Sequence, residues 1–334
     1  MIWIVRALLV LLALLVAAAA LAFVAGPREP VARDVAADPE ALPEDLDAWL
    51  AAQEAQVPDL REGAEKRIVW AGAAGARTPL AVIYVHGFSA SAEELRPVPD
   101  RVAEGLGANL FFTRLAGHGR DGAAMAEARA GDWVADMAEA MAVGRRIGER
   151  VIVIGTSTGG TLAALAALDP ALPEAGLAEG LAGIVFVSPN FRIANPAAAL
   201  LTLPWARHWL PALVGEERGF TPINAGHAAH WTTRYPSVAV LPVAALAAHV
   251  RGLEAGAARV PALFLYSEHD KVISPRAVRR MYAAWGGPKR LIPYVMAPGD
   301  DPYSHVIAGE ILSPSRTERV VAEILDWAGA LPGP

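Results

Sequence analysis

The chain has 334 residues, of which 54% are hydrophobic and 19% are charged, and this balance supports a sizeable core and excludes general disorder. The formal net charge of −6 is opposite to the basic surface that nucleic acid requires, so no nucleic-acid partner is expected. The chain has no cysteine, which excludes disulfides, thiolate metal sites and cysteine nucleophiles.

The chain begins with an apolar segment. Residues 7–25 contain no polar or charged side chain, and a run of about 20 such residues can cross a bilayer. We expect residues 1–26 to be a transmembrane anchor or a signal segment. The anchor is favoured because the run is longer than a signal-peptide core and continues past the small-residue site Ala20-Leu21-Ala22. The rest of the chain is then expected outside the cytoplasm, on the periplasmic or extracellular side; export after cleavage is the alternative.

Residues 27–66 are expected to be a linker and a short helix. The cluster Gly26-Pro27-Arg28-Glu29-Pro30 breaks regular structure, as linkers do. Residues 38–62 are acidic with scattered Leu and Trp, a composition that favours a short helix lying on the domain. The main domain is predicted over residues 67–332.

Short apolar runs rich in Val, Ile and aromatic residues recur after residue 67 and are typical of strands buried on both faces. Helices are expected between several of them, at residues 132–146, 161–168 and 275–285. This alternation predicts the α/β class, with a mostly parallel central sheet and helices on both faces. The predicted strands are residues 80–85, 109–113, 150–154, 183–187, 262–266 and 291–295.

One interval interrupts this alternation. Residues 190–256 show no clear strand and are rich in Ala, Leu, Pro and Trp. A structureless loop of this length is improbable in a compact domain, so we expect a helical insertion that forms a lid over a site. The apolar candidates for its inner wall are Leu200, Leu203, Trp205, Trp209, Leu210 and Trp231.

The segment Gly155-Thr156-Ser157-Thr158-Gly159 fits the pattern G-x-S-x-G. A predicted strand leads directly into it and a predicted helix leads directly out. This is the setting of a nucleophile elbow, a tight turn that lifts a serine hydroxyl above the sheet. The alternative, an ordinary Gly-rich turn, is disfavoured by these flanking elements.

Several segments match motifs of a known family, and they occur along the chain in the same order as in that family. They are His86-Gly87-Phe88-Ser89, Gly117-His118-Gly119, the elbow, the run from Ser267 to Ile273, and Ser304-His305. Residues 80–325 therefore resemble the α/β-hydrolase superfamily. They are most similar to its carboxylesterase and monoacylglycerol-lipase-like branch, to which serine aminopeptidases are related. The resemblance implies an α/β-hydrolase fold and the order nucleophile, acid, base along the chain.

A serine hydroxyl needs a base that accepts its proton during attack, which here is expected of His305 for the nucleophile Ser157. His305 follows the last predicted strand, where the family places its base; an ordinary loop histidine is the alternative. His86 and His118 also lie near predicted strand ends. The resemblance assigns these two to turns that shape the site.

The imidazole in turn needs a carboxylate that orients it. Asp270 follows the penultimate predicted strand, and Val272-Ile273 after it matches the family's register. Glu268, two residues earlier, is the nearest rival. Asp300 and Asp301 are expected to form a solvated turn instead.

An oxyanion hole requires backbone N–H groups that face the oxygen gaining charge. We expect one donor from Thr158, directly after the nucleophile, and the other from Phe88, in the loop after the first long strand. The sequence reads His-Gly-Phe rather than His-Gly-Gly-Gly there. This difference argues against the HGGG-type lipases and favours the branch named above.

The expected function is hydrolysis of small carboxylic esters, with lipidic or medium-chain acyl groups, through an acyl-enzyme on Ser157. No metal or organic cofactor is expected. His227 and His230 form an H-x-x-H, but this pair lacks a third ligand and an H-E-x-x-H context, so we expect ordinary polar residues rather than metal ligands. A thioesterase and a serine aminopeptidase of the same fold remain alternatives. A catalytically silent, membrane-tethered binding module is a further one.

Overall fold

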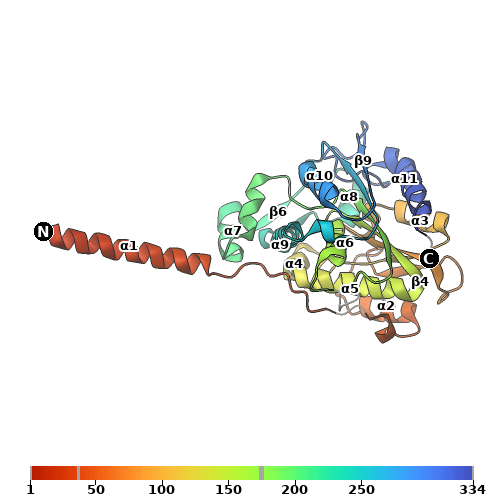
Figure 1. Cartoon of the computed structure of the whole chain (residues 1–334), viewed down its shortest axis with the longest axis horizontal. Helices are drawn as coiled ribbons and strands as arrows, with labels where there is room; N and C mark the ends of the chain where they lie inside the picture. Colours follow the sequence, from red (N-terminus) through yellow and green to blue (C-terminus); the bar gives the residue numbers. More distant parts are fainter. Residues whose placement is uncertain (1, 36–37, 173–176, 333–334) are drawn as a thin grey trace.

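The computed structural model describes residues 2–35, 38–172 and 177–332. A long N-terminal helix projects from a body built around one central sheet (Figure 1). The helix, α1 (Ile2–Val24), has a mean hydropathy of 3.0 in its most apolar window, and none of that window is buried. Within the described ranges it is the one helix long and apolar enough to cross a membrane.

Among the described residues, the central sheet has seven strands in the order β1-β3-β2-β4-β5-β8-β9. The edge strand β1 runs antiparallel to β3, and every other pair is parallel. The prediction of a mostly parallel α/β sheet is therefore confirmed. The strands are β1 (Arg67–Val69), β2 (Thr78–Val85), β3 (Asn109–Phe112), β4 (Gly148–Thr156), β5 (Leu181–Val187), β8 (Ala262–Ser267) and β9 (Lys289–Tyr294).

Helices cover both faces of the sheet, and two hydrophobic clusters lie between the layers. Along β2, Ile83 and Val85 pack in one cluster with α5, α6 and α10, while Val82 and Tyr84 pack in the other with α3 and α11. This alternation follows from the two-residue period of a strand, and it explains why both sets of positions are apolar. The helices are α3 (Val98–Leu106), α5 (Ala130–Ile147), α6 (Thr158–Leu168), α10 (Pro275–Ala284) and α11 (Thr317–Gly329).

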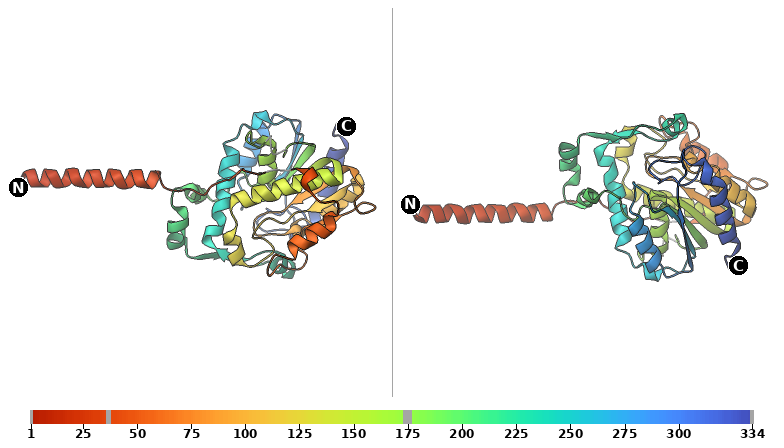
Figure 2. Two further views of the ribbon diagram at one scale, coloured as in Figure 1. Left: turned by 90° about the horizontal axis from the view of Figure 1, so that it is seen from below. Right: turned by 90° about the horizontal axis from the view of Figure 1, so that it is seen from above.

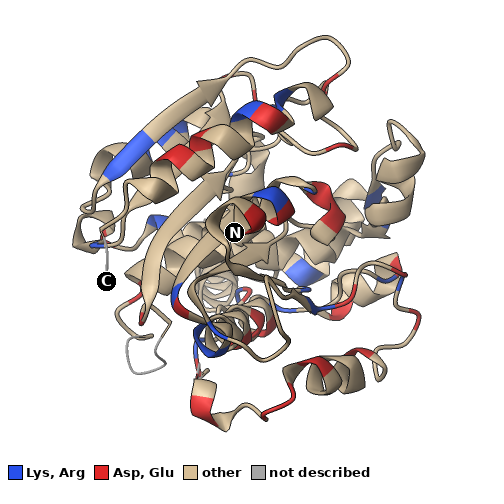
Figure 3. Ribbon diagram, turned by 90° about the vertical axis from the view of Figure 1, so that its right-hand side faces the viewer, with Lys and Arg blue, Asp and Glu red and all other residues tan. Residues whose placement is uncertain are grey.

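The acidic segment before the sheet forms the expected short helix, α2 (Leu46–Glu54). Asp45 caps it by accepting a hydrogen bond from the Ala48 N–H at 2.9 Å, while Leu46 and Leu50 are buried. In Figure 3, where acidic residues are red and basic residues are blue on the ribbon, both charge signs are interspersed over the body. The segment thus covers part of the body and reaches the sheet at β1.

Residues 190–256 leave the sheet between β5 and β8 and form an insertion beside the end of α1 (Figures 1 and 2). The insertion is mainly helical, but the expectation that it holds no strand was wrong. Its two strands have three residues each and pair only with each other, too short to leave a periodic pattern in the sequence. Its elements are η3 (Pro196–Thr202), α7 (Ala206–Val214), β6 (Glu217–Gly219), α8 (Ala225–His230), β7 (Arg234–Pro236), η4 (Ser237–Val240) and α9 (Leu241–Arg251).

Candidate active site

Ser157 lies in the tight turn between β4 and α6, with φ 51° and ψ −110°. A non-glycine residue in such a conformation costs on the order of 1–3 kcal/mol, so the surrounding structure must enforce it. The neighbouring glycines allow the turn to close: a Cβ on Gly159 would lie 2.0 Å from the Val85 carbonyl oxygen, and one on Gly155 would lie 2.7 Å from Gly159. The small residues of the motif are therefore required by close backbone approach.

His305 and Asp270 meet beyond the carboxyl ends of the strands. The Asp270 carboxylate accepts a hydrogen bond from Nδ1 of His305 at 2.8 Å, and both side chains are buried. The other Asp270 oxygen accepts hydrogen bonds from the N–H groups of Val272 and Ile273 at 2.8 and 2.9 Å. Because Asp270 binds Nδ1–H, the remaining nitrogen, Nε2, is left to accept a proton.

Glu268, the rival acid, lies elsewhere. Its carboxylate is partly exposed and binds Arg279 and the hydroxyl of Tyr266. The structure therefore brings Asp270, and not Glu268, to His305.

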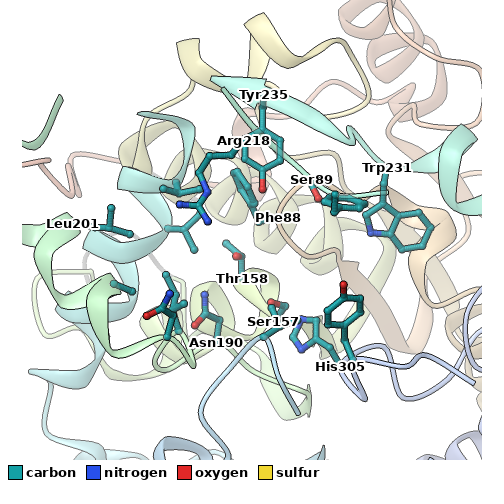
Figure 4. Close-up of a pocket in the computed structure, with 18 of the residues that line it drawn as sticks. Phe88, Ser89, Ser157, Thr158, Asn190, Leu201, Arg218, Trp231, Tyr235 and His305 are labelled. Atoms are coloured by element: carbon teal, nitrogen blue, oxygen red, sulfur yellow. The ribbon is translucent and has the colours of Figure 1, made fainter. Parts of the chain in front are cut away.

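Ser157 and His305 lie side by side at the floor of one cavity, with Thr158 next to them (Figure 4). The hydrogen bonds found in the described part of the chain do not include one between the two side chains, and such catalytic contacts often tighten only with substrate. Burial by itself lowers the pKa of His305, but the charge and hydrogen bond of Asp270 outweigh it, and the pKa is raised.

Asp300 and Asp301 are not a solvated turn, which corrects the expectation from sequence. Both are buried, and one Asp301 oxygen accepts hydrogen bonds from the N–H groups of His305 and Val306, both at 2.9 Å. Asp300 accepts from the hydroxyl of Ser315 at 2.6 Å. The two carboxylates satisfy the backbone of the loop that carries His305, and sequence position alone could not show this inward orientation.

The two expected oxyanion donors flank Ser157. Thr158 is the first residue of α6, where N–H groups have no acceptor within the helix and negative charge is favoured. Phe88 follows the end of β2, and both residues line the cavity (Figure 4). The Phe88 ring packs edge-on against His118 and Tyr235, which fixes the position of its loop.

Glu94 is a site residue that the sequence did not reveal. It is 2% exposed, accepts hydrogen bonds from the Gly87 N–H at 2.7 Å and the Tyr84 hydroxyl at 3.1 Å, and lines the cavity. Burial raises the pKa of Glu94 to about 7. The sequence could not distinguish Glu94 from the adjacent Glu93, because only the tertiary structure decides which of the two side chains points inward.

The cavity has a volume of about 520 Å³ and is lined mainly by apolar side chains of the insertion. Four of the predicted wall residues line it: Leu200, Trp209, Leu210 and Trp231. The other two, Leu203 and Trp205, do not line it and are exposed. A polar floor beneath an apolar roof is typical of a small-molecule binding site.

A comparison with protein families decides where the chain belongs. Residues 77–295, more than half of the chain, match the family described as serine aminopeptidase, S33. The chain is a member of this α/β-hydrolase family. The recognition of the superfamily from sequence is thereby confirmed.

The hydrolase is also similar to lipolytic proteins. It is 33% identical over 84 residues to the thermostable monoacylglycerol lipase of Bacillus sp. (strain H-257), a match that spans 25% of the chain and 33% of that lipase.

Three solved structures share the fold of the hydrolase. A structure described with two metagenome-derived lipolytic enzymes, LipS and LipT, has a TM-score of 0.62 at 22% identity and covers 81% of this chain and 99% of its own. The monoacylglycerol lipase of Paleococcus ferrophilus has a TM-score of 0.54 at 17% identity, with coverage of 79% and 97%. The monoglyceride lipase of Saccharomyces cerevisiae has a TM-score of 0.55 at 12% identity, with coverage of 82% and 95%.

Three other histidines, His86, His118 and His227, have backbone partners. Nδ1 of His86 donates to the Gly87 carbonyl at 2.8 Å and Nε2 accepts from the Leu115 N–H at 3.1 Å. Burial lowers the pKa of His86 to about 4 and that of His118 to about 3. His227 accepts from the Ile223 N–H at 3.2 Å and stacks on Phe220. Both His86 and His118 thus remain neutral at physiological pH.

Proposed function

We propose that the protein hydrolyses carboxylic esters through an acyl-enzyme on Ser157. The observation that carries this proposal is the pairing of His305 with Asp270 directly beside a serine held in a strained elbow. The backbone donors of Phe88 and Thr158 complete the set of groups that acyl transfer requires.

In this proposal the Ser157 oxygen attacks the ester carbonyl carbon while its proton passes to Nε2 of His305. Asp270 stabilises the resulting imidazolium without taking the proton. The oxyanion accepts hydrogen bonds from the N–H groups of Phe88 and Thr158, each worth on the order of 3 kcal/mol. The alcohol leaves with the proton from His305, and a water molecule, deprotonated by the same imidazole, then releases the acid.

We propose that the acyl group is lipidic or of medium chain length. The insertion acts as a lid in this proposal and supplies the apolar roof, to which Leu210 and Trp231 contribute buried surface. The lipases to which the chain is similar act on acyl substrates by their names, and this supports the same class here.

We further propose that α1 tethers the enzyme to a membrane, with the hydrolase domain on the periplasmic or extracellular side. Its 23 residues, apolar except for Arg6, and the absence of burial in its most apolar window support this arrangement. The alternative is an exported enzyme whose first segment is removed.

The proposal is tested with a fluorophosphonate probe and a series of p-nitrophenyl esters. The probe should label the wild-type chain and fail to label Ser157→Ala, and hydrolysis should increase from acetyl to octanoyl esters. Labelling that persists in Ser157→Ala would contradict the nucleophile. Equal rates along the series would contradict the lipidic substrate alone.

Two further substrate classes, aminoacyl p-nitroanilides and acyl thioesters, separate the alternatives. A serine aminopeptidase needs carboxylates that hold the substrate's ammonium group, but Glu217 pairs with Arg234, and Glu254 caps the short turn at Ala255. Neither lines the cavity, and neither does Glu216. Glu94 and Asp301 do line it, but their carboxylates already accept hydrogen bonds from the backbone N–H groups of Gly87 and His305. We therefore expect esters to be cleaved faster than aminoacyl p-nitroanilides or acyl thioesters. A silent binding module would show no probe labelling at all.

A further inference from the structure

The residues that follow α1 are held against the insertion. The Trp205 N–H donates to the Pro27 carbonyl at 2.8 Å, and the Trp205 ring packs directly on the buried Gly26. A Cβ on Gly26 would lie 1.8 Å from Trp205 Nε1, so only glycine fits under the ring. The end of the apolar helix is thus in contact with the insertion, as Figures 1 and 2 also show.

Three ion pairs extend this attachment. The Glu29 side chain, 3% exposed, accepts two hydrogen bonds from Arg207 of α7 at 2.6 and 2.8 Å and one from Arg129 at 3.4 Å. Further along, Arg33 pairs with the buried Asp169 at 3.1 Å. We call residues 26–33 the strap. Because buried, two-pronged Arg–carboxylate contacts fix geometry, the strap holds α7 at a set distance from the end of α1.

An apolar surface lies beside the strap. We call it the rim patch, and its members are exposed large hydrophobic residues of η3 and α7 or of the turn between them. They are Leu200 (44% exposed), Leu203 (37%), Trp205 (40%), Leu213 (66%) and Val214 (42%). Such a cluster on one face of a soluble domain marks a surface with a partner.

The rim patch also forms part of the mouth of the cavity. Leu200, Leu213 and Val214 are exposed and line the same cavity whose floor holds Ser157. The apolar path from the surface to the nucleophile therefore begins within the patch.

We propose that the rim patch lies in the interfacial layer of the membrane that α1 spans, so that an acyl ester enters the cavity directly from the lipid. This inference rests on the proposed function and on the tether. The helix α1 ends at Val24, and the Trp205 ring packs on Gly26, only two residues beyond that end. Trp205 therefore lies at the level where a membrane span would leave the hydrocarbon. Tryptophan is the side chain that membrane interfaces favour, and Leu and Val beside it bury apolar surface there.

The first test measures the position of the rim patch in the membrane. The chain has no cysteine, so single-cysteine variants of the full chain can be labelled with an environment-sensitive fluorophore at one site. Leu203→Cys and Leu213→Cys probe the patch. Ala73→Cys, exposed in the turn before β2, probes the amino end of that strand, whereas the cavity lies beyond the carboxyl ends of the strands. In phosphatidylcholine vesicles with doxyl-labelled lipid, the first two labels should be quenched and the third should not.

Quenching at Leu203 and Leu213 no stronger than at Ala73 would overturn the inference. Labels shielded from both doxyl lipid and aqueous iodide would also overturn it, because a second copy or another protein would then cover the patch. Probe labelling of Ser157 on the same samples separates the proposals. If the probe reacts with Ser157 but the fluorophores are not quenched, the membrane contact alone is refuted. If the probe does not react with Ser157, the proposed function is refuted.

The second test compares hydrolysis of a substrate in the membrane with hydrolysis of a soluble substrate. Leu203→Glu places a charge in the patch outside the cavity, and Val69→Glu places one on a similarly exposed apolar residue of β1, 42% exposed. We expect Leu203→Glu to slow hydrolysis of monoacylglycerol in phosphatidylcholine vesicles by about tenfold or more, since a charge disfavours the interface. Hydrolysis of soluble p-nitrophenyl butyrate should be unchanged in both variants. Equal loss on both substrates, or no loss on vesicles, would refute lipid-phase entry.

Discussion

The floor of the cavity is organised by hydrogen bonds between polar groups, whereas its roof consists of apolar side chains. On the floor, polar groups are fixed by hydrogen bonds: Asp270 accepts from two backbone N–H groups and from His305, and Asp301 accepts from the backbone of the His305 loop. The roof is formed by apolar side chains of the insertion, and Leu213 there is 66% exposed.

This difference assigns the chemical step to the floor and the binding of the acyl chain to the roof. Stabilisation of developing charge needs donors and acceptors that do not reorganise, and a rigid sheet edge provides them. An acyl chain needs only an apolar wall of adequate volume, which an insertion can provide with looser packing. Substitutions on the floor should therefore affect rate with every ester, and substitutions in the roof should affect rate only with long ones.

The largest effect is expected from His305→Ala on the floor. Loss of the base should lower kcat by about 10⁴-fold or more for short and long esters alike, because the serine hydroxyl then has no proton acceptor. Steady-state hydrolysis of p-nitrophenyl esters measures it. His230→Ala, in α8 and outside the cavity lining, is the matched control. Similar rates for the two variants would remove His305 from the mechanism.

The second effect concerns the rigidity of the floor. Gly159→Ala should lower the free energy of unfolding by about 3 kcal/mol, because its Cβ would meet the Val85 carbonyl at 2.0 Å. Gly72→Ala is the control, since no atom lies within 4 Å of its Cβ position. Denaturant unfolding of both variants checks this. If Gly159→Ala unfolds like the control, the elbow is not as tightly packed as described.

A smaller and selective effect is expected in the roof. Leu210→Ala should lower kcat/KM by about tenfold for long-chain esters and leave the acetyl ester unchanged, because it removes apolar contacts that only a long chain can make. Leu106→Ala, in α3 outside the cavity lining, controls for general destabilisation. Equal losses for short and long esters would show that floor and roof are not separable.

The smallest effect is a displacement of the pH profile. His305 must be neutral to act as base, so kcat/KM should fall as pH decreases through its raised pKa. The Glu94 carboxylate contributes to that raised pKa, so Glu94→Gln should move the acidic limb to lower pH. The displacement should be a fraction of a pH unit, because burial already raises the pKa of Glu94 to about 7 and leaves it partly protonated. A limb at unchanged pH, or displaced upward, would contradict this coupling.

The sequence by itself determined the features that local pattern encodes. The alternation of short apolar runs with helical segments predicted the parallel sheet, and the unbroken run at residues 7–25 predicted a membrane-length helix. The glycines around Ser157 predicted a tight strand-to-helix turn. These features follow from neighbours in the chain, because side-chain period and backbone sterics act over a few residues.

Only the tertiary structure decided which polar groups face the cavity and which apolar ones face outward. Asp301 turns inward against the backbone of the His305 loop, Glu94 rather than Glu93 reaches Gly87, and Trp205 packs on Gly26. In each case the partner is either distant in sequence or chosen between adjacent, chemically similar residues. Local propensity does not distinguish such pairs, because burial and hydrogen-bond satisfaction are properties of the assembled fold.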